Sequence, residues 1–132
     1  MGKGQRERIE NPMPKITPPP VSTCVWTGKS GTKYTYYDYP ILHVFDANED
    51  GNYIFVRVAD NQSHPVYIGE GNLTDRNSEQ HHQSACIKSK GATRFHAHPN
   101  PVKANRKAEE EYLLANYTQA YSPTGCNVKE GG

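Results

Sequence analysis

The sequence predicts a small α/β protein of the α+β type, with a three-stranded, mainly antiparallel sheet flanked by helices. Residues 53–58 and 66–68 are rich in β-branched and aromatic side chains, which is typical of strands. The intervening residues 59–65 include Asp, Asn, Ser and Pro, and they predict a hairpin loop. Residues 92–97 alternate in polarity and predict the third strand.

Two helical segments are expected to flank these strands. Residues 72–90 predict a partly exposed helix, or two short ones, with Asn72 as the N-cap. Residues 102–117 consist mainly of good helix formers. Asn100 and Pro101 precede them and suit the N-cap and the first helical position.

Length and composition place these elements in one domain. The chain has 132 residues, of which 34% are hydrophobic, and a mean hydropathy of −0.88, so part of it is not expected to pack. Residues 1–20 are crowded with charges, Gly and Pro, and predict a disordered N-terminal arm. Residues 21–50 predict a β-rich extension that packs on the core, where packing of Trp26 is favoured over base stacking. Residues 51–128 form the main domain, and residues 129–132 are expected to be a frayed tail.

Charge and cysteine content restrict the expected partners and compartment. The formal net charge is +1, so no strong field of the whole molecule attracts nucleic acid. The sequence shows neither an apolar run as long as a membrane span nor a signal-peptide pattern, so we expect no membrane partner and a cytoplasmic location. Cys24, Cys86 and Cys126 are odd in number and widely spaced, which favours buried or free thiols over a disulfide framework or a zinc site.

Two histidines share one face of the third predicted strand. His96 and His98 are separated by one residue, so their side chains point the same way. Such a pair can bind zinc or copper, but no third ligand lies at a motif spacing. Phosphate contact or simple exposure is therefore the favoured interpretation.

Glu110 occupies an unusual position in the second predicted helix. Counting back by three, four or seven residues from the apolar residues near the end of this helix leads repeatedly to Glu110. A carboxylate in line with an apolar stripe needs a partner or a metal ion. Arg106 lies one turn earlier and is the expected partner, whereas Glu109 and Glu111 are expected to be solvated.

Several of these residues, taken in order, resemble the GIY-YIG nuclease family. Gly51-Asn52-Tyr53 is a degenerate first signature, with Asn52 where Ile is usual, and Tyr67-Ile68-Gly69 matches the second signature in full. Glu70 follows where a neutral or basic residue is commoner. The further matches follow in the family's order over residues 51–127 and are Arg76, His81 or His82, Glu110 with Leu113 and Leu114, and Asn127 after Pro123.

This resemblance implies a metal-dependent endonuclease that hydrolyses phosphodiester bonds in DNA. It assigns Tyr53 as the base or the water-orienting phenol, polarised by Tyr67 or by a histidine, with His81 preferred over His82. Arg76 would clamp the phosphate.

The same resemblance assigns the cofactor and the remaining residues. Glu110 would hold a single Mg²⁺ or Mn²⁺ ion, and Asn127 would brace the site through hydrogen bonds. DNA is the expected partner, with RNA left open, and a homodimer or a second protein would supply further DNA-binding surface. The alternatives are a catalytically faded GIY-YIG-like domain that binds nucleic acid or protein, and an unrelated small α/β binding module.

Overall fold

The protein folds around one five-stranded antiparallel sheet. The computed structural model describes residues 22–129, so the expected disordered arm (1–20) and nearly all of the expected frayed tail (129–132) lie outside the described residues. The strand order across the sheet is β1-β2-β5-β3-β4. The strands are β1 (Ser22–Thr27), β2 (Lys33–Pro40), β3 (Asp50–Ala59), β4 (Gln62–Asn72) and β5 (Arg94–Pro99).

The α+β class is confirmed, but the three-stranded sheet is wrong. The extension at 21–50 forms the β1–β2 hairpin, and β2 pairs antiparallel with β5, with Tyr39 opposite Phe95. The extension therefore enlarges the central sheet. The pattern of side chains in a strand does not reveal which backbone it will pair with, so the sequence could not show this.

The β3–β4 hairpin is longer and tighter than predicted. Asp60 and Asn61 alone form the turn, with φ angles of 55° and 60°, in the left-handed region that Asp and Asn tolerate better than most residues. Gln62 already pairs with Ala59. Pro65 lies opposite Val56, which is compatible with its missing N–H because β4 is an edge strand. The predicted loop at 59–65 is thus mostly strand.

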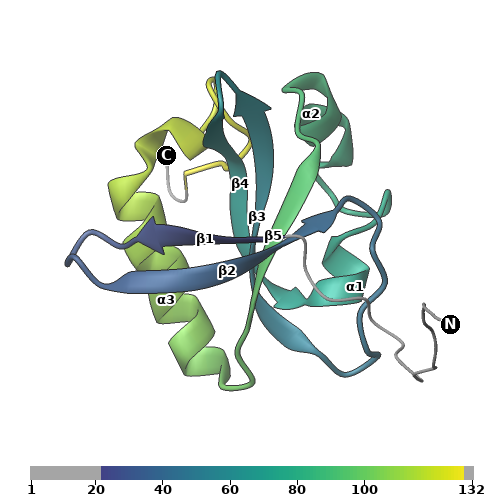
Figure 1. Cartoon of the computed structure of the whole chain (residues 1–132), viewed down its shortest axis with the longest axis vertical. Helices are drawn as coiled ribbons and strands as arrows, with labels where there is room; N and C mark the ends of the chain where they lie inside the picture. Colours follow the sequence, from purple (N-terminus) through teal and green to yellow (C-terminus); the bar gives the residue numbers. More distant parts are fainter. Residues whose placement is uncertain (1–21, 130–132) are drawn as a thin grey trace, which may run out of the picture.

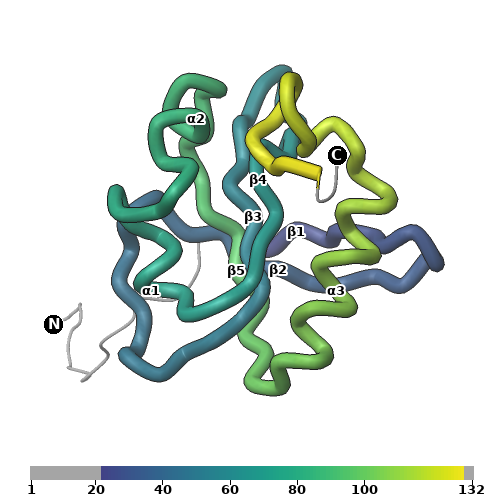
Figure 2. Tube along the Cα trace, turned by 180° about the vertical axis from the view of Figure 1, so that it is seen from behind, coloured from purple at the N-terminus to yellow at the C-terminus, as the bar shows by residue number. Residues whose placement is uncertain are grey.

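Helices cover both faces of the sheet, as Figures 1 and 2 show from opposite sides. On one face, α1 (Leu73–Arg76) and α2 (Ser84–Ser89) pack on a core that includes Tyr53, Phe55 and Phe95. On the other face, α3 (Lys103–Asn116) and the short 3₁₀ helix η1 (Thr118–Ala120) pack on a second core. Its buried members include Trp26, Tyr36, Ile54, Ile68 and Leu113.

The helix predictions are partly confirmed. Residues 72–90 hold two short helices, and the side chain of Asn72 caps the first by accepting from the Asp75 N–H at 3.0 Å. The second predicted helix begins later than expected, because Val102 is its N-cap and no side chain caps it. Across residues 22–129, every helix is too short or too polar to cross a membrane.

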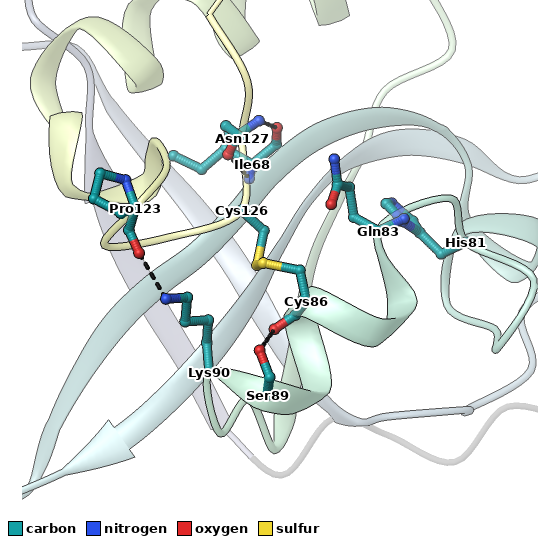
Figure 3. Close-up of a disulfide and its surroundings, with 9 residues drawn as sticks. All are labelled: Ile68, His81, Gln83, Cys86, Ser89, Lys90, Pro123, Cys126 and Asn127. Carbon is teal, nitrogen blue, oxygen red and sulfur yellow. Dashed lines mark hydrogen bonds between the residues drawn. A yellow bond between two sulfur atoms is a disulfide. The ribbon is translucent and has the colours of Figure 1, made fainter.

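A disulfide joins α2 to the segment before Asn127. Cys86 and Cys126 are 40 residues apart in sequence, and their Cα atoms lie 5.9 Å apart (Figure 3). Beside this bond, the Lys90 ammonium donates to the Pro123 carbonyl at 2.6 Å. The expectation of unpaired thiols is therefore wrong for these two residues. Cys24 is free.

We predict that Cys86→Ser lowers the free energy of unfolding by about 2–4 kcal/mol, because the disulfide closes a long loop in the unfolded chain. Denaturant unfolding of the oxidised protein measures this change. Cys24→Ser is the matched control, and it should change stability by less than about 1 kcal/mol. Alkylation of the denatured, unreduced protein should label one thiol, and labelling of three would contradict the pairing.

Candidate active site

Two tyrosines meet on one face of the β3–β4 pair. Tyr53 lies opposite Gly69 and Phe55 lies opposite Tyr67, which makes the tyrosines diagonal neighbours. Their ring centroids are 6.0 Å apart with an interplanar angle of 20°. The expectation that they can meet diagonally is confirmed.

Gly69 provides the room for this pair. A Cβ atom at residue 69 would lie 2.5 Å from the Tyr53 hydroxyl oxygen and 2.9 Å from Cε1 of Tyr67. Both distances are shorter than van der Waals contact, so any larger residue must displace a phenol. The glycine of the Tyr-Ile-Gly sequence is therefore needed for space.

His81 hydrogen-bonds Tyr53 from the loop between α1 and α2. Its Nε2 lies 2.8 Å from the Tyr53 hydroxyl, and its Nδ1 accepts from the backbone N–H of Gln83 at 2.9 Å. Burial, followed by the charges of His82 and Arg76, lowers the pKa of His81 to about 4. The imidazole is therefore neutral at pH 7.

His82 belongs to the other tyrosine. Its Nε2 lies 3.4 Å from the Tyr67 hydroxyl, at the long end of hydrogen-bond distance, and its side chain is exposed. The two imidazoles stack, with centroids 4.6 Å apart. The sequence could not separate the two histidines, and the structure shows that each contacts a different tyrosine.

Arg76, at the end of α1, brings positive charge to the same place. Gly71 has a φ of +144°, and a Cβ atom there would lie 2.5 Å from Nε of Arg76, so the glycine lets the guanidinium side chain lie against β4. The Arg76 charge acts to lower the pKa of both Tyr53 and Tyr67. Within residues 22–129, Arg76 takes part in no ion pair.

A cleft of about 490 Å³ opens beside β4. Tyr67 and His82 line it from one side, and Glu110 of α3 and Asn127 line it from the other. The structure thus brings side chains from distant segments of the chain to one cleft. Within residues 22–129, the side chains that line it do not include Tyr53, His81 or Arg76.

Glu110 is mostly enclosed at this cleft, with 19% of its side chain exposed. Burial raises its pKa, as do the nearby carboxylates of Glu70 and Glu111, whereas Lys107 acts to lower it. Lys107 lies 3.5 Å from the Glu110 carboxylate. The expected pairing with Arg106 is wrong, because Arg106 faces the sheet.

The buried stripe of α3 contains Glu109 in place of the predicted Glu110. Arg106, Glu109 and Leu113 are its buried residues. Glu109 is 3% exposed and receives hydrogen bonds from Tyr36 and His98, so the expectation that it is solvated is wrong. This polar stripe was missed because charged residues at buried positions look like a solvated face in the sequence.

Asn127 fixes the strand that carries Tyr67. Its side-chain oxygen accepts from the Ile68 N–H at 2.8 Å, and its side-chain nitrogen donates to the Ile68 carbonyl at 2.9 Å. These two bonds satisfy backbone groups of an edge strand that has no further neighbour in the sheet. Asn127 therefore holds this segment of β4 in place (Figure 3).

The two departures from the family signatures share one partner. Glu70 accepts from the Arg106 guanidinium at 2.8 Å, and the Asn52 side chain donates to the Arg106 carbonyl at 2.9 Å. Asn52 is fully buried and lies opposite Glu70 in the sheet. These residues thus connect α3 to the strands that carry the tyrosines. A polar Asn inside an apolar strand was the sequence signal for this contact.

His96 and His98 do share a face, but they bind different partners. His96 Nδ1 accepts from the indole N–H of Trp26 at 3.0 Å, and His98 contacts Glu109. Trp26 is 3% exposed, which confirms packing over base stacking. Within residues 22–129, no group of three or more His, Cys, Asp or Glu side chains is placed to hold a metal.

Comparison of the chain with protein-family models, with curated proteins and with solved structures gives no significant match. The case for a function therefore rests on the geometry of this cleft.

We predict that His81 makes stability depend on pH between 6.5 and 4. The pKa of His81 is about 4 in the folded state and near 6.5 in the unfolded state. Its contribution to the free energy of unfolding is therefore fully present above pH 6.5 and is lost as the pH falls to 4. Over this interval the wild type should lose about 1–3 kcal/mol more than His81→Gln. Denaturant unfolding across the pH range measures the difference. His82→Gln, the exposed neighbour, should keep most of the wild-type dependence, and the same slope in His81→Gln and wild type would contradict the assignment.

We predict that Asn127→Ala destabilises the protein by about 1–3 kcal/mol, because both backbone groups of Ile68 lose their partner. Thermal and denaturant unfolding measure the loss. Asn105→Ala, an exposed change within α3, is the matched control and should stay within about 0.5 kcal/mol of wild type. Equal stability of the two variants would show that the hydrogen bonds between Asn127 and Ile68 contribute nothing to stability.

Proposed function

We propose that this protein is a metal-dependent endonuclease that hydrolyses phosphodiester bonds in DNA, with the GIY-YIG-like arrangement that its sequence resembles. The observation that carries the proposal is a cleft lined by Tyr67, His82 and the enclosed carboxylate of Glu110. Tyr53 stacks on Tyr67 and is hydrogen-bonded to the neutral His81, and the charge of Arg76 acts on both phenols. Phosphoryl transfer needs an oriented water, a cation near the phosphate and charge stabilisation. Each of these tasks has a suitable side chain here.

Glu110 is the residue that would hold the metal ion. Mg²⁺ commonly binds through one or two carboxylates and completes its shell with waters and substrate phosphates. Glu110 fits this pattern, because it is a cleft-lining carboxylate whose described ion-pair partner is the exposed Lys107. Asn127 would not be a ligand, because both ends of its amide are bonded to Ile68. When bound, the ion would stabilise negative charge on the phosphoryl group.

The other residues act on the substrate directly or through a neighbour. Arg76 would pair with a phosphate oxygen, because its charge acts on both tyrosines and it is in no ion pair within residues 22–129. One phenol of the Tyr53–Tyr67 pair would orient the attacking water. Asn127 is a positioning residue, since it holds the strand below Tyr67.

Partners and compartment complete the proposal. DNA is the proposed substrate and RNA remains open, and the net charge of +1 calls for a homodimer or a second protein to supply binding surface.

The cytoplasmic location stays a prediction. The Cys86–Cys126 disulfide favours an oxidising compartment instead, because such bonds are rare in reducing ones.

A catalytically faded domain that binds nucleic acid or protein is the second candidate. The Lys107–Glu110 ion pair favours it, because an ammonium 3.5 Å from the carboxylate competes with a metal ion. The two candidates share this geometry and differ in whether Glu110 binds a divalent ion and supports cleavage.

We predict that the wild type cuts labelled duplex or branched DNA with Mg²⁺ or Mn²⁺, and that Glu110→Gln lowers the rate by about 100-fold or more. Gel assays of single-turnover cleavage measure the rates, and electron paramagnetic resonance measures Mn²⁺ binding. Glu111→Gln, the exposed neighbour on α3, is the matched comparison and should lose no more than a few-fold. Equal rates for Glu110→Gln and wild type would show that another carboxylate, or a contaminant, is responsible. Failure of the wild type to cut or to bind Mn²⁺ would favour the faded domain.

A further inference from the structure

The two tyrosines of the site differ in access to solvent. Tyr53 is 1% exposed. Among residues 22–129, Tyr53 is not one of those that line the cleft. Tyr67 is partly exposed and lines the cleft together with His82 and Glu110. A water or phosphate oxygen in the cleft therefore reaches the Tyr67 hydroxyl first.

The hydrogen bonds around His81 have a direction that follows from one backbone amide. The Gln83 N–H can only donate, so Nδ1 of His81 is the acceptor and carries no proton. A neutral imidazole then has its single proton on Nε2, which donates to the Tyr53 oxygen at 2.8 Å. Figure 3 shows His81 and Gln83 just before α2, on the chain that the disulfide anchors.

This direction prevents His81 from acting as a base toward Tyr53. The imidazole gives a hydrogen bond to the phenol and has no free lone pair on that side to receive its proton. The Tyr53 proton is then available to the neighbouring Tyr67, which faces it across the side-chain-free position at Gly69. His81 thus donates to the Tyr53 oxygen, and Tyr53 in turn directs its own hydroxyl proton toward Tyr67.

We propose that Tyr67, not Tyr53, is the phenol that receives the proton of the attacking water. His82 accepts the hydroxyl proton of Tyr67 and passes it to solvent, and Tyr53 and His81 are positioning residues. The inference rests on the proposed nuclease function and reverses the roles that the family resemblance assigns to the two tyrosines. His82 is suited to carry this proton from Tyr67 to solvent, because it is exposed and its Nε2 lies 3.4 Å from the Tyr67 hydroxyl.

The proton transfers balance in this scheme. Tyr67 gives its hydroxyl proton to Nε2 of His82, and the phenolate oxygen then takes one proton from the attacking water. The resulting hydroxide forms the new bond to phosphorus while the bond from phosphorus to the leaving oxygen breaks. The leaving oxygen takes a proton from solvent, and His82 releases its proton to solvent.

The charges around the two phenols agree with this assignment. Burial raises the pKa of both residues, and that of Tyr53 lies well above its usual value. The neighbouring Tyr67 acts to raise the pKa of Tyr53 further, whereas the Arg76 charge acts to lower the pKa of both phenols. Tyr67 is therefore the member of the pair that ionises more readily.

Single-turnover cleavage with Mn²⁺ by Tyr67→Phe, Tyr53→Phe and His82→Ala tests the proposal in the full-length protein. We expect Tyr67→Phe to lose about 100-fold or more in rate, and Tyr53→Phe to lose about tenfold or less. His82→Ala should slow the reaction, and added imidazole should restore it, because the exposed site admits a small base. A merely structural role for His82 would not respond to imidazole. Circular dichroism and unfolding curves identify any variant that fails to fold. If a Phe variant fails to fold, a nitrated or fluorinated tyrosine at the same position takes its place. The modified tyrosine should shift the pH profile of the rate at residue 67 and should leave the profile unchanged at residue 53.

A second measurement needs no cleavage. NMR of nitrogen-labelled histidine should show His81 neutral and protonated on Nε2 at pH 7. A proton on Nδ1 would overturn the proposal. Cleavage by the wild type with a larger loss in Tyr53→Phe than in Tyr67→Phe would also overturn it, while leaving the proposed nuclease function intact. No cleavage by the folded wild type would overturn the nuclease function and, with it, the catalytic role of Tyr67.

Discussion

The placement of Tyr53 opposite Gly69 in the β3–β4 register is the constraint on which the site depends. This register makes Tyr53 and Tyr67 diagonal neighbours on one face, and a shift by one residue would turn one phenol to the opposite face. The absent side chain at Gly69 then leaves space for the Tyr53 hydroxyl, which a Cβ atom would approach to 2.5 Å. The contact between Tyr53 and His81 requires that same space.

The site lies around the edge strand of the sheet, which explains how helices on opposite faces can contribute to it. β4 is the last strand, so groups from the loop before α2 and from α3 reach the same cleft around its free side. An edge strand lacks a second neighbour to hold it, and Asn127 supplies two hydrogen bonds there instead. The disulfide between Cys86 and Cys126 ties this support to α2.

The two departures from the family signatures are parts of one contact. Asn52 and Glu70 are opposite each other in the sheet, and both bind Arg106 of α3. The buried guanidinium of Arg106 needs the Glu70 carboxylate, whereas the Asn52 amide binds the backbone carbonyl of the same residue, so both contacts fix where α3 packs on the sheet. The acidic residue after Tyr-Ile-Gly is thus committed to Arg106 and also lies close enough to Glu110 to raise its pKa.

The sequence by itself determined the α+β class, the Tyr-rich hairpin, a helical segment after it and a long helix that carries Glu110, because these follow from local side-chain pattern and capping. Through a resemblance in order and spacing, it also singled out four residues that line the cleft, Tyr67, His82, Glu110 and Asn127. Only the tertiary structure decided that the sheet has five strands, that Cys86 and Cys126 pair, and that His81 binds Tyr53 while His82 is placed at Tyr67. Each of these depends on which distant segments meet in space, and that choice is made by long-range packing, which no local pattern contains.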